Sequence, residues 1–161
     1  MTDVTVLGPP AAPPRRRLPD ERPSAEWSFA LPYQSDELFP GEDVPRVTLM
    51  PAKLVIGFYP DGTLGEIFLR CGPQGSTLSG LFDAWGRAAS MLLQYGVPLA
   101  DVIHSFRGFR FQPAGVVVPI DDSAPVPVPF VSDGIPPVLI ASSVVDAVMQ
   151  YLEVRLLGVR P

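Results

Sequence analysis

The sequence predicts an α+β fold, a small antiparallel sheet centred on a hairpin at 52–72 and packed by two long helices. Three observations support this prediction. Residues 52–72 alternate apolar and polar side chains on either side of a turn sequence, which is typical of a hairpin. Residues 76–95 and 141–157 repeat apolar side chains with the helical period of about 3.6. Apolar residues make up 47% of the 161, with a mean hydropathy of +0.24, which is enough for the core of one domain.

The uneven distribution of proline along the sequence separates a compact body from Pro-rich segments. There are 21 prolines, a share more than twice the usual level of roughly 5%, and they are scarce in the middle of the chain. We therefore expect a Pro/Arg-rich arm at 1–23 and a single domain at 24–161, with Pro-rich insertions at about 32–51 and 115–137. The three arginines at 15–17 are interpreted as a solvated tail, with contact to phosphate or to an acidic partner as the alternative.

The strands can be assigned in chain order. Alternation from Trp27 to Leu31 predicts a short strand, and 32–51 is interpreted as a surface loop that is briefly extended at 47–49. The hairpin turns at 60–62, because proline sets φ near about −65° and glycine accepts a positive φ. In the second strand of the hairpin one face is expected to be buried (Ile67, Leu69, Cys71) and the other to face water (Glu66, Phe68, Arg70).

The strongest helical signal lies at 76–95. Its expected inward face follows the helical repeat and comprises Leu78, Leu81, Phe82, Trp85, Ala88, Ala89, Leu92 and Tyr95. Gly96 is suited to end this helix, and Pro98 prevents it from continuing. A second, shorter helix is expected at about 98–107.

The C-terminal part combines extended and helical segments. Residues 109–111 are expected to form a small extended segment. The alternating prolines that follow cannot join a central strand, so polyproline II or a surface strap is expected there. Ser142 or Ser143 is expected to cap the last helix, which runs to about Leu157.

The helix at 76–95 also carries a candidate interface. Its apolar arc is broad for a small domain, and Gly80 and Gly86 would permit the close approach of another backbone. With Trp85 and Tyr95 they form the candidate interface, for a second copy of the chain or for another protein. A helix that packs only within its own core remains the alternative.

One local feature is suited to an anion. Ser76 and Thr77 open this helix, where free backbone N–H groups and the helix dipole favour negative charge, and Arg70 or Arg110 could supply a counter-charge, as could Arg107. The alternative is that Ser76 or Thr77 simply caps the helix.

Other chemistry finds little support. Cys71 is the single cysteine and lies on the apolar face of its strand, so we interpret it as an inert core thiol. His104, the single histidine, is interpreted as a surface residue, and no spacing indicates a metal or cofactor site. We therefore predict no catalytic, cofactor-binding or metal-binding residue.

Charge and hydropathy bear on partners and location. The net charge of −5 makes nonspecific binding to nucleic acid unfavourable. No apolar run has the ~20 residues that span a membrane, and residues 1–14 lack the features of a signal peptide. We expect a cytoplasmic protein with no membrane contact.

Five stretches, taken in order, resemble one known family. They are RRRLPDERPS (15–24), GFYPDGTLGEIFLR (57–70), GSTLSGLFDAWGRAASMLLQYGVPL (75–99), RFQPAG (110–115) and IASSVVDAVMQYL (140–152). Together they are similar to the C-terminal region of vitamin-B12-dependent ribonucleotide reductases, the TSCPD domain. The Thr-Ser-Cys-Pro-Asp string of that domain is absent here, and the stretches 32–51 and 115–137 look longer than in the reductases.

The resemblance implies an association with deoxynucleotide synthesis rather than reductase activity. Reduction in this family needs a radical-forming cysteine, a reducing cysteine pair and a place for adenosylcobalamin, which a chain with one cysteine cannot provide alone. A D-x-H-x-x-G cobalamin motif is also absent, since Asp101 and His104 have the wrong spacing. We therefore expect no cofactor, and no catalytic residue of the family has a match here.

The expected function follows from this resemblance. We expect a non-catalytic, freestanding relative of the reductase domain that acts through protein–protein contacts, with a reductase, a second copy of the chain or a larger assembly as partner. The first alternative is a structural or assembly protein, for instance of a virus-like particle, that uses the Pro-rich arm and loops as straps. The second alternative is a nucleotide or anion sensor.

Overall fold

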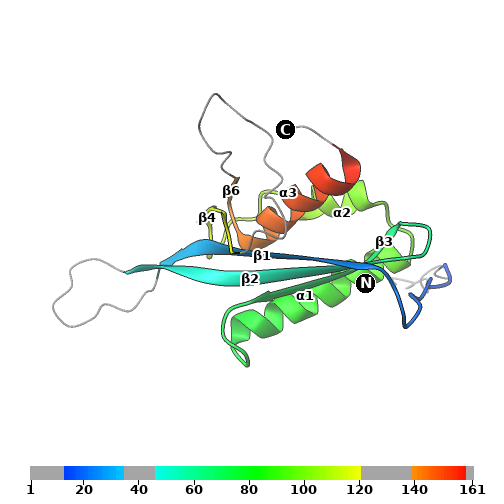
Figure 1. Cartoon of the computed structure of the whole chain (residues 1–161), viewed down its shortest axis with the longest axis horizontal. Helices are drawn as coiled ribbons and strands as arrows, with labels where there is room; N and C mark the ends of the chain where they lie inside the picture. The colour runs from blue at the N-terminus through cyan, green and yellow to red at the C-terminus, as the bar shows by residue number, and fades with distance from the viewer. Residues whose placement is uncertain (1–12, 35–45, 121–138, 159–161) are drawn as a thin grey trace, which may run out of the picture.

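The computed structural model describes residues 13–34, 46–120 and 139–158 (Figure 1). In chain order the elements are β1 (Ser24–Gln34), β2 (Val47–Phe58), β3 (Leu64–Cys71), α1 (Thr77–Gln94), α2 (Leu99–Phe106), β4 (Gly115–Val116), β5 (Val118–Pro119), β6 (Ile140–Ala141) and α3 (Val144–Leu157). The predicted α+β class is confirmed, with an antiparallel sheet of order β3-β2-β1-β5 and a small β4-β6 pair. None of the helices in these ranges combines the length and apolar character needed to cross a membrane.

β1 and β2 form a longer hairpin than the sequence suggests. Their register runs from Ser24 opposite Gly57 to Gln34 opposite Val47, so the expectation of a surface loop is wrong for 32–34 and for 50–51. The extended segment expected at 47–49 is the start of β2. The prolines here lie outside the paired stretches of the neighbouring strands, since Pro51 comes before the first residue of β2 paired with β3, and Pro32 lies past the residues of β1 paired with β5. The carbonyl oxygen of Pro32 accepts a hydrogen bond from the backbone N–H of Ala114 (3.1 Å). Residues 35–45 lie outside the described part of the chain.

The segment after α2 also differs from expectation. Residues 109–111 do not form a strand, whereas Val118–Pro119 pairs as the short edge strand β5 with Phe29 and Ala30 of β1. Gly115–Val116 pairs with Ile140–Ala141 of β6. The alternating prolines fall in 121–138, outside the described residues, so the expected strap there stays a prediction.

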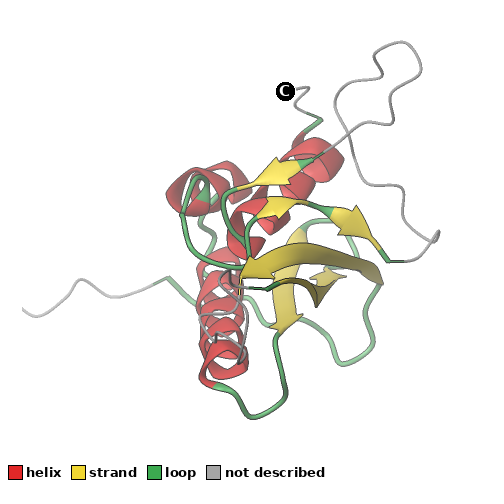
Figure 2. Cartoon of the chain, turned by 90° about the vertical axis from the view of Figure 1, so that its left-hand side faces the viewer, coloured by secondary structure: helices red, strands yellow, loops and turns green. Residues whose placement is uncertain are grey.

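One face of the sheet is buried, as predicted. Trp27, Phe29 and Leu31 of β1 lie on this face with the inward side chains of β2 and β3. The ring of Trp27 stacks on Phe29 at 3.9 Å and on Tyr151 of α3 at 4.4 Å between centroids, so α3 covers this face. In Figure 2 the helices lie mainly on one side of the strands. The opposite face carries Phe68 and Arg70, which are exposed as expected.

α1 has the predicted bounds but a different buried face. Its buried residues are Phe82, Gly86, Ala89, Ser90, Leu93 and Gln94. Four residues of the expected inward face are exposed instead, namely Leu81, Ala88, Leu92 and Tyr95.

The reason for this rotation is the free edge of β3, which needs polar partners. Ser90 Oγ accepts a hydrogen bond from the backbone N–H of Ile67 (2.9 Å), and the Gln94 amide donates to the carbonyl oxygen of Gly65 (2.9 Å). Because these contacts satisfy an exposed strand edge, the polar side of the helix is turned inward.

The N-terminal arm contacts the body over 15–22. The backbone N–H of Arg16 donates to the Gln94 carbonyl oxygen (2.8 Å), and the guanidinium of Arg16 lies over the ring of Tyr59, 3.8 Å from its centroid, and pairs with Asp61. Arg15 donates to the side chain of Gln94. Arg15 and Arg16 are exposed to solvent, as expected, but the interpretation as a tail without contacts to the body is wrong for both.

Candidate functional site

An apolar cleft opens between α1, the loop that follows α2, and α3. Its volume is about 400 Å³. The lining side chains from α1 are Leu78, Leu81, Phe82 and Trp85, those from the loop are Phe109, Phe111 and Gln112, and α3 contributes Val145. Several of these apolar side chains are exposed, with Leu81 at 61%, Phe109 at 50% and Phe111 at 38%. A contiguous exposed apolar surface of this kind is typical of a site of protein contact.

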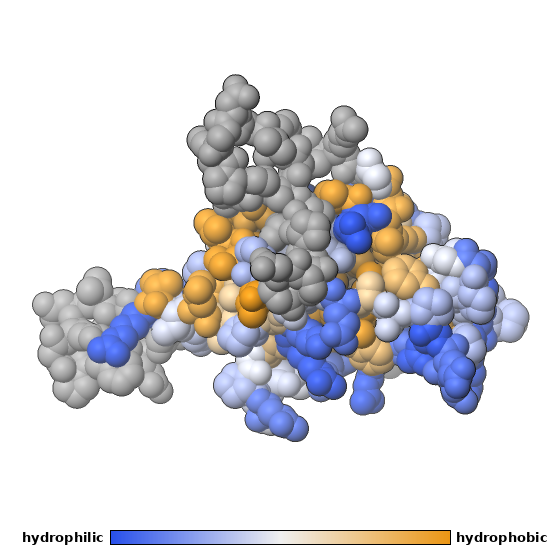
Figure 3. Space-filling model, in the orientation of Figure 1, coloured by the Kyte–Doolittle hydropathy of each residue, from blue (hydrophilic) through white to orange (hydrophobic). Residues whose placement is uncertain are grey.

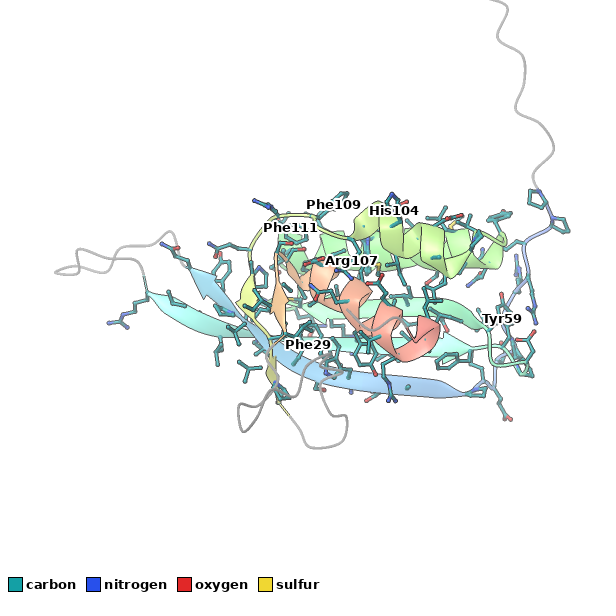
Figure 4. The ribbon with its side chains drawn as sticks, turned by 90° about the horizontal axis from the view of Figure 1, so that it is seen from above. Phe29, Tyr59, His104, Arg107, Phe109 and Phe111 are labelled. Atoms are coloured by element: carbon teal, nitrogen blue, oxygen red, sulfur yellow. The ribbon has the colours of Figure 1, made fainter. Side chains whose placement is uncertain are left out.

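Aromatic rings connect the walls of the apolar cleft. Phe82 and Phe111 approach to 6.2 Å between centroids, and Trp85 meets Phe106 edge-on at 5.7 Å. Phe106 in turn meets Phe109 edge-on at 6.0 Å. Such pairs favour a fixed arrangement of the rings, so the exposed aromatics are held in place. Figure 4 shows Phe109 and Phe111 together on the loop, with Tyr59 at the other end of the molecule.

A buried carboxylate holds this loop against α3. Asp146 lies in the first turn of α3, is 5% exposed, and accepts hydrogen bonds of 2.9 Å from the backbone N–H groups of Gly108 and Ser142. It also accepts from the Ser142 hydroxyl and the Gln150 amide, each at 2.9 Å, and its oxygen lies 3.4 Å from the guanidinium of Arg107. The loop thus begins from a fixed point immediately before Phe109.

Hydrogen bonding decides the protonation of this carboxyl. Burial by itself would raise the pKa of Asp146, but the bonds from Gly108, Ser142 and Gln150 together hold that pKa below its ordinary value. The site at the start of α3, where the helix dipole favours negative charge, is suited to the ionised form. Asp146 is therefore a structural anion rather than a proton donor.

The four residues of the predicted interface lie in different environments. Trp85 lines the apolar cleft, and Tyr95 is 37% exposed at the C-terminal end of α1. Gly80 is exposed, and a Cβ there would meet open space. Gly86 does allow close backbone approach, but to its own sheet, because a Cβ would lie 2.9 Å from the carbonyl oxygen of Ile67. Gly86 is therefore wrong as an interface residue.

At the start of α1 the capping alternative is confirmed for Ser76. Its side chain accepts from the backbone N–H of Ser79 at 3.2 Å. Neither Ser76 nor Thr77 nor Arg110 lines the apolar cleft, and Arg70 lies on the open face of the sheet. The anion site formed by these four residues stays a prediction.

The single cysteine and the single histidine lie where the sequence predicts them, in the core and on the surface. Cys71 is 2% exposed, and burial raises the pKa of its thiol to about 11. His104 is exposed on α2 and does not line the apolar cleft. Within residues 13–34, 46–120 and 139–158, no three His, Cys, Asp or Glu side chains are grouped as metal ligands.

Sequence reasoning missed three residues of this site. Phe109 and Phe111 flank Arg110 in a segment with no helical or strand pattern, and two large aromatics in such a segment are a signal of an exposed contact. Asp146 follows Ser143 at the spacing of a capping box, Ser-x-x-Asp, which marks the start of α3 and its acidic first turn.

Comparison with known proteins gives a consistent result. The family model described as TSCPD domain matches residues 44–156. Proteins named vitamin B12-dependent ribonucleotide reductase from Streptantibioticus cattleyicolor and Streptomyces clavuligerus are each 35% identical over 140 residues, which is 87% of this chain and 18% and 11% of theirs. One from Rhodopirellula baltica is 36% identical over 103 residues, 64% of this chain and 8% of its own. The chain thus spans less than a fifth of the length of these relatives, and no solved structure matches it.

Proposed function

The chain belongs to the TSCPD domain family, and on this basis we propose that it serves deoxynucleotide synthesis as a non-catalytic domain that binds a ribonucleotide reductase. The binding surface in this proposal is the apolar cleft. The domain either supplements the reductase or regulates it through this contact.

The exposed aromatic wall of the apolar cleft is the observation that carries the proposal. Leu81, Phe109 and Phe111 present apolar surface to solvent although they are anchored by ring contacts and by the loop's attachment to Asp146. In the relatives named as reductases, the matched region is at most 18% of the polypeptide. The rest of such a reductase chain is therefore the partner that we expect to cover the corresponding apolar surface. Rigid, exposed aromatics are the side chains that dominate protein interfaces.

The state of the thiol supports a non-catalytic role. Reductase chemistry as implied by the family resemblance needs several reactive cysteines. The chain has only Cys71, whose raised pKa keeps it protonated and whose burial shields it. The contribution of this domain is then contact rather than electron transfer.

The test is a binding measurement with the B12-dependent reductase of the organism from which the chain comes. Calorimetry should detect a complex with the full chain, and Phe109→Ser should weaken it about thirtyfold, because truncating a central aromatic typically costs about 2 kcal/mol. Met91→Ser is the matched control, since Met91 is also exposed, at 44%, on α1 but lies outside the apolar cleft.

Two results would count against the proposal. One is the absence of any complex at micromolar concentrations of both proteins. The other is equal affinity of the Phe109 and Met91 variants, with circular dichroism showing both folded. Recovery of the chain from its source in a large assembly without a reductase would favour the structural alternative instead.

A further inference from the structure

A second cleft lies on the open face of the sheet, where β2 and β3 meet the outer side of α1. Its volume is about 390 Å³. The lining residues that matter are Glu26, Lys53, Phe68, Arg70, Asp83 and Arg87, and we call it the charged cleft. Figure 3 shows hydrophilic residues mostly along the lower side of the molecule, where α1 lies in Figure 1, and apolar residues mostly above the sheet.

The sheet register places two cations side by side in the charged cleft. Lys53 of β2 is directly opposite Arg70 of β3, and both side chains lie on the open face. Like charges at directly opposed positions of an antiparallel pair destabilise a sheet. Arg87 of α1 adds a third cation to the same cleft. Three neighbouring positive charges lower the stability of this part of the fold. Positions where a sequence lowers local stability in this way are typical of functional sites.

Two of the three cations have no carboxylate partner. Lys53 pairs with Glu26 at 2.5 Å. Within the described part of the chain, neither Arg70 nor Arg87 lies within 4.0 Å of a carboxylate, although Asp83 is one helical turn from Arg87. Unpaired guanidiniums at one cleft stand out in a chain with a net charge of −5. They are suited to bind an external anion, and phosphate matches the planar fork of arginine.

An aromatic ring lies beside these cations. Phe68 is two residues before Arg70, on the same face of β3, and its side chain is 43% exposed. Its opposite neighbour, Val55, also lines the charged cleft. An exposed ring next to phosphate-binding cations can stack a nucleobase, which every base permits because each has a π-face.

We infer that the charged cleft binds a nucleoside phosphate, with Arg70 and Arg87 on the phosphates and the base against Phe68. This site differs from the predicted anion site at the start of α1, because Ser76, Thr77 and Arg110 do not line it, although Arg70 is common to both. It is also separate from the apolar cleft, which shares none of its lining residues. The inference therefore does not depend on the proposed reductase contact.

The experiment is isothermal titration of the full chain with ATP, with inorganic triphosphate and with adenosine. ATP is expected to bind more tightly than either fragment. Arg87→Gln should weaken ATP binding about tenfold, because it removes a charge-assisted hydrogen bond. Phe68→Ser should weaken ATP binding while leaving inorganic triphosphate unchanged. Arg155→Gln is the matched control, an exposed arginine on α3 outside the charged cleft, and should bind ATP as the unmodified chain does. Arg110→Gln tests the alternative anion site at the start of α1.

The outcomes separate the possibilities. Failure of ATP to bind at millimolar concentration overturns the inference, as does full ATP affinity in the folded Arg87→Gln variant. Loss of affinity in Arg110→Gln but not in Arg87→Gln would place the anion at the start of α1 instead, and equal effects of Phe68→Ser on ATP and triphosphate would overturn the role of the ring.

Discussion

Replacing Asp146 by alanine should destabilise the chain and release the loop that carries Phe109 and Phe111 from α3. In the native chain the Asp146 carboxylate accepts hydrogen bonds from two backbone N–H groups, those of Gly108 and Ser142, at 2.9 Å each. Both bonds are partly buried, so water replaces the carboxylate poorly. The Gln150 amide, which also donates to Asp146, is only half-buried and can turn toward solvent.

The magnitude follows from these groups. Leaving a buried donor without a partner costs about 1–3 kcal/mol. Because both N–H groups are only partly buried, we use the lower part of this range, which gives roughly 2–4 kcal/mol for the two together. Loss of a negative charge from the first turn of α3 adds about 0.3–1 kcal/mol. We therefore expect Asp146→Ala to lower the free energy of unfolding by about 3 kcal/mol, which for a chain of 161 residues corresponds to a fall in Tm of about 6–12 °C.

Urea unfolding followed by circular dichroism measures this difference directly. Asp83→Asn is the control, because it removes an exposed carboxylate and should change stability by less than about 0.5 kcal/mol. Below its Tm, the Asp146→Ala variant should also lose affinity for the reductase, since its aromatic loop is no longer held. A loss of stability below about 1 kcal/mol would refute this reasoning.

The same carboxylate predicts a pH dependence. The pKa of Asp146 is lower in the folded chain than the ordinary aspartate value of about 3.9, so the unfolded chain takes up its proton first on acidification. Its stabilising contribution is therefore complete above about pH 5 and is lost as the pH falls through 3.9 toward the folded pKa. The stability difference between the unmodified chain and Asp146→Asn should shrink over this range, whereas a constant difference would contradict the lowered pKa.

Three further predictions test the packing of the fold. Gly86→Ala should destabilise the chain by about 1–3 kcal/mol in urea unfolding, because the added Cβ would lie 2.9 Å from a strand carbonyl oxygen. Gly80→Ala, into open space on the same helix, should stabilise by about 0.5–1 kcal/mol, and equal effects would contradict this packing. Cys71, with a pKa of about 11, should react with a disulfide reagent at pH 8 only upon unfolding, so rapid labelling of the native chain would disprove its burial. A double-mutant cycle of Arg22→Gln and Glu66→Gln should give a coupling of about 0.5–1 kcal/mol that falls with salt, and no coupling would show that this pair does not hold the arm.

Local signals were sufficient for most elements of the fold. The bounds of α1, α2 and α3 and the buried face of β3 follow from periodicity and from caps such as Ser143, because these depend on residues close in sequence. The length of the β1–β2 hairpin does not follow in this way. Proline argues against a strand in general, and only the sheet order shows that Pro32 and Pro51 fall beyond the neighbouring strands.

The candidate sites depend on contacts that no local pattern contains. Lys53 and Arg70 are opposite each other only through the register of β2 and β3, and Arg87 joins them only because α1 packs along β3. Asp146 reaches Gly108 across a separation of 38 residues. Sequence reasoning could name the residue types involved, such as the arginines, but not which of them converge.

The error in the buried face of α1 bears directly on the proposed function. A periodicity count assigns leucines and aromatics to the core, but the edge of β3 requires hydrogen-bonding and small side chains, and Gly86, Ser90 and Gln94 supply them. A helix that turns this stripe inward must place other apolar residues outward. Leu81 is exposed for this reason. Within the described residues, no other element of the chain packs over its side chain enough to bury it. Leu81, which the count wrongly placed in the core, thereby becomes part of the apolar cleft, and in the proposed function the reductase covers it.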